Sequence, residues 1–227
     1  MTSDDGGTEA DVLARTANER WAALIESGEV QMFGEPTGVA AVLSEPDPAW
    51  TPRFRDVRER IQRALGATAV RIEHVGSTAI PGIAAKPVID VQVSVPNIEA
   101  EDTYREQLAG LGWPMRSREP GHRYFRTGKG VEPRIQVHIC EVGSEWERDH
   151  LLFRDYLRSH PDQAQAYANL KRAFVERYGK DMLAYAAAKT PFIRSTIQAA
   201  ERWAAETAWS LPETSGRWPR GLGLGPR

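Results

Sequence analysis

Apolar and polar residues alternate along two neighbouring segments in the middle of the chain. Over residues 88–95, β-branched residues occupy every second position, and Asp90 lies on the other face. Successive side chains of a strand point to opposite faces, so this pattern predicts a strand with one core face and one face that carries an acid. Residues 70–75 also alternate and then reach the small residues Gly76 and Ser77, which predicts a strand that ends in a turn.

The remaining apolar patterns predict further strands and a series of helices. Residues 122–127 and 134–140 have the composition of strands and are joined by a glycine-rich turn, and residues 38–43 are a further short strand candidate. Helical spacing predicts helices over residues 8–27, 51–65, 97–112, 145–158, 161–178, 181–188 and 190–208. At residues 51 and 190 a threonine cap precedes a proline, a common start for a helix. Together these elements predict an α+β fold: a mixed β-sheet with flanking helices mainly on one side and a helical C-terminal part.

The pattern divides the chain into three parts. Residues 1–35 form an N-terminal extension with one probable helix, which we interpret as an accessory helix packed on the main domain; the alternative is a helix that docks a partner. Residues 36–208 form the main domain, with a sheet part that ends at about residue 144 and a helical part over residues 145–208. We expect disorder before about residue 8 and in the tail, residues 209–227, which is rich in glycine, proline and arginine.

Composition excludes several classes of protein. With 41% hydrophobic and 26% charged residues, the chain of 227 residues has the make-up of a globular protein with its own core. A formal charge of −2 gives no reason to expect a nucleic-acid partner. No apolar run approaches the roughly 20 residues of a membrane helix, and the N-terminus lacks the features of a signal peptide, so we expect no membrane and a cytoplasmic location. The single cysteine, Cys140, excludes an internal disulfide and a thiolate zinc site built from this chain alone.

Asp90 and the turn before its strand carry the first candidate chemistry. A strand fixes the position of the Asp90 carboxylate, as metal or phosphate chemistry requires. The small residues Gly76 and Ser77 allow backbone N–H groups and a hydroxyl to approach a phosphate. A Gly-Ser turn followed by a strand with alternating carboxylates is the nucleotidyltransferase signature, in which carboxylates hold Mg²⁺ against a nucleoside triphosphate. Here Gln92 occupies the place of the second acid, which argues against a two-metal clamp.

The strand over residues 134–140 provides the next candidate metal ligands. Gln136 and His138 share one face of it, and if that face adjoins Asp90, the set becomes Asp90, Gln92, Gln136 and His138. We therefore expect a divalent metal, Mg²⁺ or Mn²⁺, while the mixture of carboxylate and imidazole would suit Mn²⁺, Fe²⁺ or Zn²⁺ better than Mg²⁺. The alternative is that His138 only hydrogen-bonds Asp90.

Several basic residues are candidates for binding phosphate. His74 is either a phosphate ligand or general base, or a core residue with a local hydrogen bond. Lys86 meets either a phosphate or the acid Asp90, or it forms a structural ion pair. Tyr185 and Lys189, four apart on one helix, either close the pocket or pack the helices onto the sheet. Arg123, Arg154 and Lys171 are weaker candidates. The alternative is that their charges belong to an ordinary solvent-exposed face of a helix or strand.

The segment from Glu73 to Asp90, EHVGSTAIPGIAAKPVID, closely resembles the hallmark of the GrpB-like family. Further matching motifs are Asp47–Trp50, Val137–His138, Leu152–Arg158, His160–Pro161, Tyr167, Leu170–Lys171, Tyr185 and Lys189–Ile193. The resemblance covers roughly residues 36–203 and leaves the N-terminal extension and the tail outside. It implies a nucleotidyltransferase-like fold, a small mixed sheet with flanking helices. Some relatives are fused to dephospho-coenzyme A kinase, which implies a partner or accessory role, and the family likeness defines the fold more firmly than the function.

Two functional hypotheses follow. The first is an enzyme that binds a nucleotide or another phosphorylated small molecule through Gly76, Ser77 and Lys86, uses a divalent metal at Asp90 and His138, and transfers a nucleotidyl group or activates an acid for ligation. The second is a non-catalytic module of the same fold that binds a ligand or a partner such as a coenzyme A pathway kinase. Gln92 in place of the second acid favours the second hypothesis.

Overall fold

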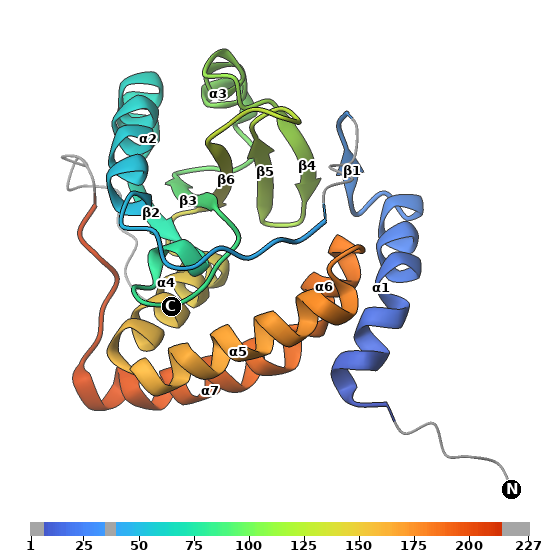
Figure 1. Ribbon diagram of the computed structural model, residues 1–227. Coiled ribbons are helices and arrows are strands. Elements are labelled where there is room, and N and C mark those ends of the chain that lie inside the picture. Colours follow the sequence, from blue (N-terminus) through green and yellow to red (C-terminus); the bar gives the residue numbers. More distant parts are fainter. Residues whose placement is uncertain (1–6, 35–39, 215–227) are drawn as a thin grey trace, which may run out of the picture.

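The computed structural model describes residues 7–34 and 40–214, and these contain one mixed six-stranded sheet in the order β1-β4-β5-β6-β3-β2 (Figure 1). The strands are β1 (Gln31–Met32), β2 (Arg71–Val75), β3 (Val88–Val95), β4 (Met115–Glu119), β5 (His122–Arg126) and β6 (Arg134–Glu141). The helices are α1 (Glu9–Glu26), α2 (Trp50–Leu65), α3 (Arg105–Gly110), α4 (Glu145–Ser159), α5 (Pro161–Tyr178), α6 (Met182–Ala188) and α7 (Thr190–Thr207). No helix in these described ranges has the length and apolar character needed to cross a membrane.

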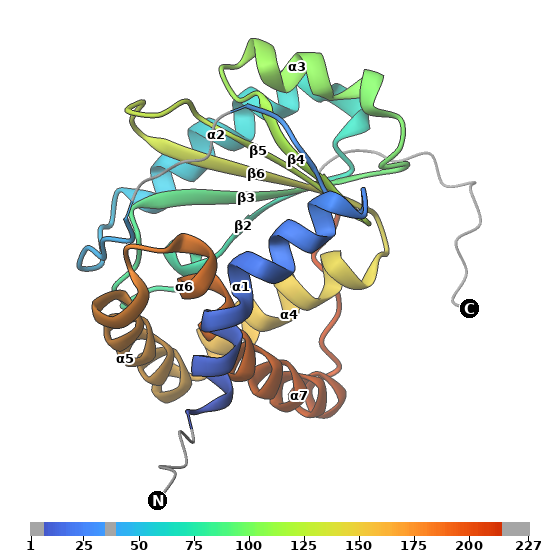
Figure 2. The same ribbon diagram turned by 90° about the vertical axis from the view of Figure 1, so that its right-hand side faces the viewer.

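The sheet lies between two layers of helices. Figure 2 shows α2 and α3 over one face and α4, α5 and α7 over the other, with α1 and α6 at the side of this second layer. Most of the helices therefore lie on one side of the sheet, as expected, and α2 and α3 cover the other. The β-branched face of β3 is fully buried because the apolar stripe of α2, with Val57 and Ile61, covers it. A second core joins α4, α5 and α7 on the opposite side.

Strand register places the polar residues of β3 and β6 on one face, as the alternation predicts. The two strands run parallel, and Asp90 lies beside Gln136 while Gln92 lies beside His138. Strand β2 pairs antiparallel with β3, so that Val75 lies beside Asp90 and Glu73 beside Gln92. The intervening residue of β2, His74, therefore points to the face that α2 covers.

Two helix starts differ from the sequence-based prediction. Helix α2 begins at Trp50, one residue before the predicted cap, and Ala49 occupies the N-cap position without a side-chain bond. Asp47 makes the local contact instead, because its carboxylate accepts a hydrogen bond of 2.8 Å from the Ala49 N–H. Helix α7 likewise includes Thr190 and has Lys189 at its N-cap position. In both cases the threonine before the proline already has helical geometry, so it does not act as the cap.

Other differences concern short segments. The helix predicted over residues 97–112 is a 3-10 turn (Glu101–Thr103) followed by the short helix α3. Of the strand predicted over residues 38–43, positions 38 and 39 lie outside the described residues and the rest is not a strand; only Ser44 forms an isolated bridge, to Ala85. Strands β1 and β4 were not predicted, because a strand of two residues and the charged sequence of β4 carry little apolar alternation.

The N-terminal helix and the chain beyond α7 are both tied to the main domain. Helix α1 packs along α6, where the Asn18 side chain donates a hydrogen bond of 2.5 Å to Asp181. Arg177 pairs with Asp11 at 2.8 Å. After α7 the carbonyl of Pro212 accepts a bond of 3.0 Å from Arg71, so this part of the predicted disordered tail has a defined contact. Residues 1–6 and 215–227, where disorder was also predicted, lie outside the described residues.

A buried ionic network joins the sheet to α4. The Glu147 side chain is 0% exposed and accepts hydrogen bonds from Arg71 of β2, from the Ser94 hydroxyl of β3 and from the Gly143 N–H. The Glu147 backbone carbonyl accepts a further bond of 3.3 Å from Gln92. This network fixes the start of α4 against the polar face of β3. The position of α4 in turn sets where the later helices lie.

We predict that Glu147→Ala lowers the free energy of unfolding by about 3–5 kcal/mol, because it leaves the Arg71 charge buried without its partner. Urea denaturation measures the loss. The matched control is Glu201→Ala, which breaks the ion pair between Arg148 of α4 and Glu201 of α7, where the side chains are 40% and 44% exposed. The control should cost less than about 1 kcal/mol. Equal losses in the two variants would contradict the assignment of this network as the main link between the layers.

Candidate functional site

The Asp90 carboxylate packs directly on Gly76. Gly76 has φ 68°, and a Cβ placed on it would lie 2.3 Å from Oδ2 of Asp90. Only glycine combines this backbone conformation with so close an approach. The Asp90 side chain keeps 22% of its surface exposed, so the carboxylate lies at the edge of the buried interior rather than inside it. The predicted turn-and-acid pair is therefore a single local structure.

Three lysines from separate parts of the chain act on this carboxylate or on one another. The pKa of Lys189, at the junction of α6 and α7, is lowered to about 8, and burial is the main cause. The Lys86 charge contributes to this lowering, whereas the Asp90 charge opposes it. Burial also lowers the pKa of Lys86, again opposed by Asp90. Lys171 of α5 has its pKa lowered to about 7, by burial first and then by Lys189 and other cations. We call Asp90, Lys86, Lys171 and Lys189 the Asp90 cluster.

Aromatic residues and backbone groups hold the lysines of the Asp90 cluster. The Tyr185 ring lies 4.6 Å from Nζ of Lys189 and 5.8 Å from Nζ of Lys86, a cation–π arrangement. Nζ of Lys171 donates a hydrogen bond of 2.6 Å to the carbonyl of Ala84. The C-terminal helices thus cover the sheet, and they also bring Lys189 near Asp90 and Lys171 to the loop before β3.

Ser77 and Tyr167 lie beside this cluster. A hydrogen bond to the Ser77 side chain lowers the pKa of the Tyr167 hydroxyl, while burial, the larger effect, raises it to about 12. Tyr167 is buried, and its ring lies 4.7 Å from Nζ of Lys171. The serine of the turn therefore faces α5 and the lysine that this helix supplies.

His138 connects Asp90 to a chain of titratable groups across four strands. Its Nε2 atom lies 3.7 Å from Oδ1 of Asp90, too far for a hydrogen bond but within the range of an ion pair when the ring is protonated. Its Nδ1 atom lies 3.0 Å from Nε2 of His122, whose own Nδ1 lies 3.5 Å from Glu119. The Trp146 ring stacks over both histidines. This arrangement orients the His138 ring toward Asp90.

The protein side chains near Asp90 are too few to hold a metal ion by themselves. A bound phosphate ligand would have to supply most of the coordination. Across residues 7–34 and 40–214, no three His, Cys, Asp or Glu side chains are grouped as a metal site. Gln92, the residue at the second acid position, donates its amide N–H to Glu147 and is 0% exposed. Its Oε1 atom is buried and has no hydrogen-bond partner among the described residues. Asp90 and His138 remain as candidate ligands.

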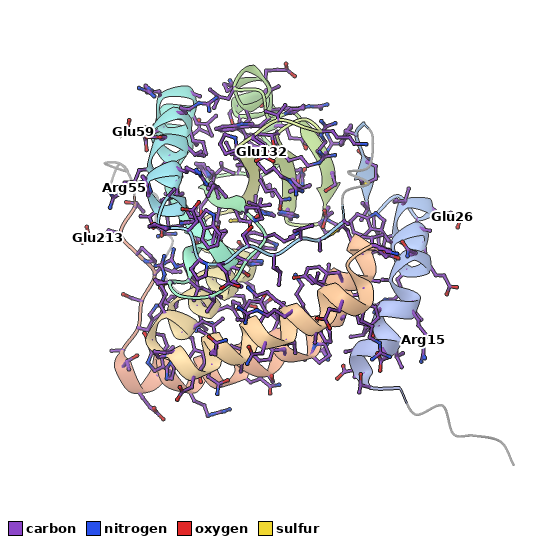
Figure 3. All side chains as sticks on the ribbon, viewed as in Figure 1. Arg15, Glu26, Arg55, Glu59, Glu132 and Glu213 are labelled. Atoms are coloured by element: carbon purple, nitrogen blue, oxygen red, sulfur yellow. The ribbon has the colours of Figure 1, made fainter. Side chains whose placement is uncertain are left out.

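A pocket of about 290 Å³ lies at the β5–β6 hairpin beside Asp90. Its lining includes Arg126, Arg134 and Gln136, and Gln136 is the cross-strand neighbour of Asp90. Figure 3 shows Glu132, another lining residue, in the same hairpin. Neither arginine was among the candidate site residues chosen from the sequence. The pattern was nevertheless present, because Arg134 and Gln136 lie on the same face of one strand and Arg126 lies on its partner strand. The pocket extends the basic surroundings of Asp90 toward the hairpin.

Three other residues named as candidates lie away from the Asp90 cluster. His74 is 5% exposed on the opposite face of the sheet, where its ring stacks on Phe54 at 4.7 Å and burial lowers its pKa to about 4. Arg123 is 2% exposed and binds the carboxylates of Glu99 and Glu101. Arg154 of α4 binds Glu73 at 2.6 Å and the His74 carbonyl at 3.0 Å.

Comparisons with known proteins place the chain in a family. The family model described as GrpB protein matches residues 40–199. A UPF0157 protein of Streptomyces coelicolor is 42% identical over 165 residues, which are 72% of this chain and 86% of that protein. The crystal structure of the conserved protein GrpB from Enterococcus faecalis aligns with a TM-score of 0.63 and 31% identity, covering 71% of this chain and 99% of that chain.

A longer relative is also similar. A dephospho-CoA kinase of Mycolicibacterium paratuberculosis is 32% identical over 233 residues, which are 91% of this chain and 57% of the kinase, so that protein contains a further segment outside the match. These similarities confirm the resemblance that the segment from Glu73 to Asp90 indicates. The chain belongs to the GrpB protein family.

Proposed function

We propose that this protein binds a nucleotide or another phosphorylated small molecule at the Asp90 cluster and acts on it as a metal-dependent, nucleotidyltransferase-like enzyme. The observation that carries the proposal is the placement of Lys86 and Lys189 near the Asp90 carboxylate beside the Gly76 turn, with Lys171 next to Lys189. Three partly desolvated ammonium groups exceed what one carboxylate needs. The surplus positive charge suits a ligand that carries several negative charges.

The turn and the hairpin pocket add to the phosphate-binding character of the site. The chain at Gly76 and Ser77 has no large side chain, so a phosphate can approach the backbone there. Arg126 and Arg134 line the adjoining pocket of about 290 Å³, which is near the lower size limit of small-molecule sites. A phosphate chain between the lysines and these arginines would place its reacting phosphorus near Asp90.

A divalent metal fits the site as an ion shared between protein and ligand. Mg²⁺ commonly binds one or two carboxylates together with substrate phosphates, and here Asp90, with His138 beside it, would hold the ion. When bound, the metal would offset phosphate charge during an in-line attack. Because Gln92 supplies no second carboxylate, the lysines take over charge neutralisation that a second metal provides in two-metal sites. The order of strand, Gly-Ser turn and acid-bearing strand supports a nucleotidyltransferase-like fold.

We predict that Lys189→Met weakens the binding of ATP, CTP, GTP or UTP, whichever binds wild type best with Mg²⁺ or Mn²⁺, by at least about tenfold, because a charged hydrogen bond is lost. Isothermal titration calorimetry measures the affinity. Lys180→Met is the matched control, since Lys180 is an exposed lysine just beyond α5, which ends at Tyr178. Asp90→Asn should remove the metal-dependent part of the affinity. Equal affinity in Lys189→Met and Lys180→Met, or no nucleotide bound by wild type, would overturn the proposal.

Binding should also depend on pH in a defined direction. Lys171 and Lys189 attract phosphate only when protonated, and their pKa values in the free protein are about 7 and about 8. Affinity should therefore fall as the pH rises from about 7 to about 9, a range in which phosphate is already largely dianionic. Titrations at several pH values test this, and the fall should be shallower in Lys189→Met. An affinity that rises with pH over this range would show that the lysines do not contact the ligand.

The similarity to a dephospho-CoA kinase supports a second candidate function, a non-catalytic module that binds a ligand or a kinase of the coenzyme A pathway. The matched part of that kinase covers 91% of this chain. We would test it by measuring nucleotide turnover chromatographically, together with binding of dephospho-coenzyme A and of the unmatched segment of that kinase. Turnover that is lost in Asp90→Asn excludes this function. Binding of either probe without turnover favours it over the enzyme.

A further inference from the structure

A second basic pocket lies at the β2 edge of the sheet, apart from the Asp90 cluster. It has a volume of about 330 Å³ and is formed by α2, β2 and α4. Its charged lining consists of Arg55 and Arg58 from α2, Arg154 and Arg158 from α4, and Glu73 from β2. Figure 3 shows Arg55 at the margin of the molecule, on the side where the chain passes Glu213. We call this the β2-edge pocket.

The charge of the β2-edge pocket is strongly positive. Four guanidinium groups and one carboxylate, Glu73, line it; Glu73 is bound to Arg154 at 2.6 Å, and Asp155 outside the lining pairs with Arg154 at 2.7 Å and with Arg158 at 3.6 Å. His74 adds no charge near neutral pH because burial lowers its pKa to about 4. The arginines that line the pocket therefore outnumber the carboxylates that line or adjoin it, which favours an anionic ligand.

Two of the arginines are held in place before any ligand binds. Arg154 has a side chain only 5% exposed and is fixed by Glu73, by Asp155 at 2.7 Å and by the His74 carbonyl at 3.0 Å. Arg158 donates its Nε–H to the Ala79 carbonyl at 2.8 Å, while its side chain remains 38% exposed. A guanidinium oriented in this way can offer its remaining N–H groups to a phosphate at low entropic cost.

The apolar part of the pocket is flat. The rings of Phe54 and His74 stack with an angle of 9° between their planes, and both residues belong to the lining. Nε2 of His74 lies 3.0 Å from the Thr78 hydroxyl, which itself donates to the Val88 carbonyl, so the ring is anchored at the sheet. The pocket thus combines planar apolar surface with several guanidinium groups.

We propose that the β2-edge pocket is a second anion site that binds a phosphate group, either as inorganic phosphate or on a small phosphomonoester. Arginine matches this chemistry because its planar N–H groups pair with two phosphate oxygens at once. The β2-edge pocket shares no lining residue with the Asp90 cluster, although the Asp90 charge acts on His74 and opposes the effect of burial on its pKa. It adds to the proposed function and does not rest on it.

The test is calorimetric titration of the full chain with inorganic phosphate and with phenyl phosphate at low ionic strength. We expect the double variant Arg55→Ala/Arg58→Ala to weaken binding by at least about tenfold, in line with the loss of charged hydrogen bonds. Both residues are exposed on α2, so the fold should persist, as circular dichroism can verify. Arg63→Ala, an exposed arginine in the last turn of the same helix, is the matched control and should bind like wild type.

Additional variants separate the two sites. Arg158→Gln changes the opposite wall and should weaken binding in the same direction, also in a Lys189→Met background in which the Asp90 cluster is impaired. Tighter binding of phenyl phosphate than of inorganic phosphate would support a phosphomonoester as the occupant. Loss of binding in Lys189→Met without loss in the arginine variants would overturn this inference and leave the proposed function standing. Absence of phosphate binding in wild type, or equal loss in Arg63→Ala, would also overturn it.

Discussion

The polar face of β3 must find partners in the helices that cover it, because buried polar groups without partners are costly. At the C-terminal half of the strand, Ser94 and Gln92 meet Glu147 of α4, and Arg71 completes a closed structural network. At the other half, Asp90 lies near Lys86 and near Lys189 of the α6–α7 junction, which in turn lies next to Lys171 of α5. One strand thus fixes the helical layer at one end and assembles a charged site at the other.

This division explains why Gln92 has a structural role and not that of a catalytic acid. Its amide is directed to the backbone of α4, where a carboxylate would meet a carbonyl oxygen and Glu147. The position belongs to the structural half of the strand. Under the proposed function, lysines whose pKa values burial has lowered would supply the positive charge that a second metal ion supplies in two-metal sites. A binding site for phosphates is compatible with this arrangement, whether or not turnover follows.

Local alternation in the sequence was enough to predict β2, β3, β5 and β6 and to place Gln136 and His138 on one face of their strand, whereas the pairing of β3 with β6 was needed to bring Asp90 to that face. Strand alternation also required that Glu73 and His74 point to opposite faces, but only the pairing with β3 decided which of them lies on the Asp90 side. The convergence of Lys171 and Lys189 could not be read from spacing, since it depends on how three helices pack on the sheet. Short or charged strands such as β4 lack the apolar signal that would reveal them.

Lys189 lies partly desolvated near Asp90, and Lys171 lies partly desolvated next to Lys189. NMR titration of the lysine side chains, in wild type and in Asp90→Asn, tests this arrangement most directly. The account predicts that Lys171 titrates near 7 and Lys189 near 8, well below their usual pKa of 10.5. Replacing Asp90 should lower the pKa of Lys189 further, because the carboxylate stabilises its charge. Titration of both lysines near 10.5, unchanged in Asp90→Asn, would contradict the account.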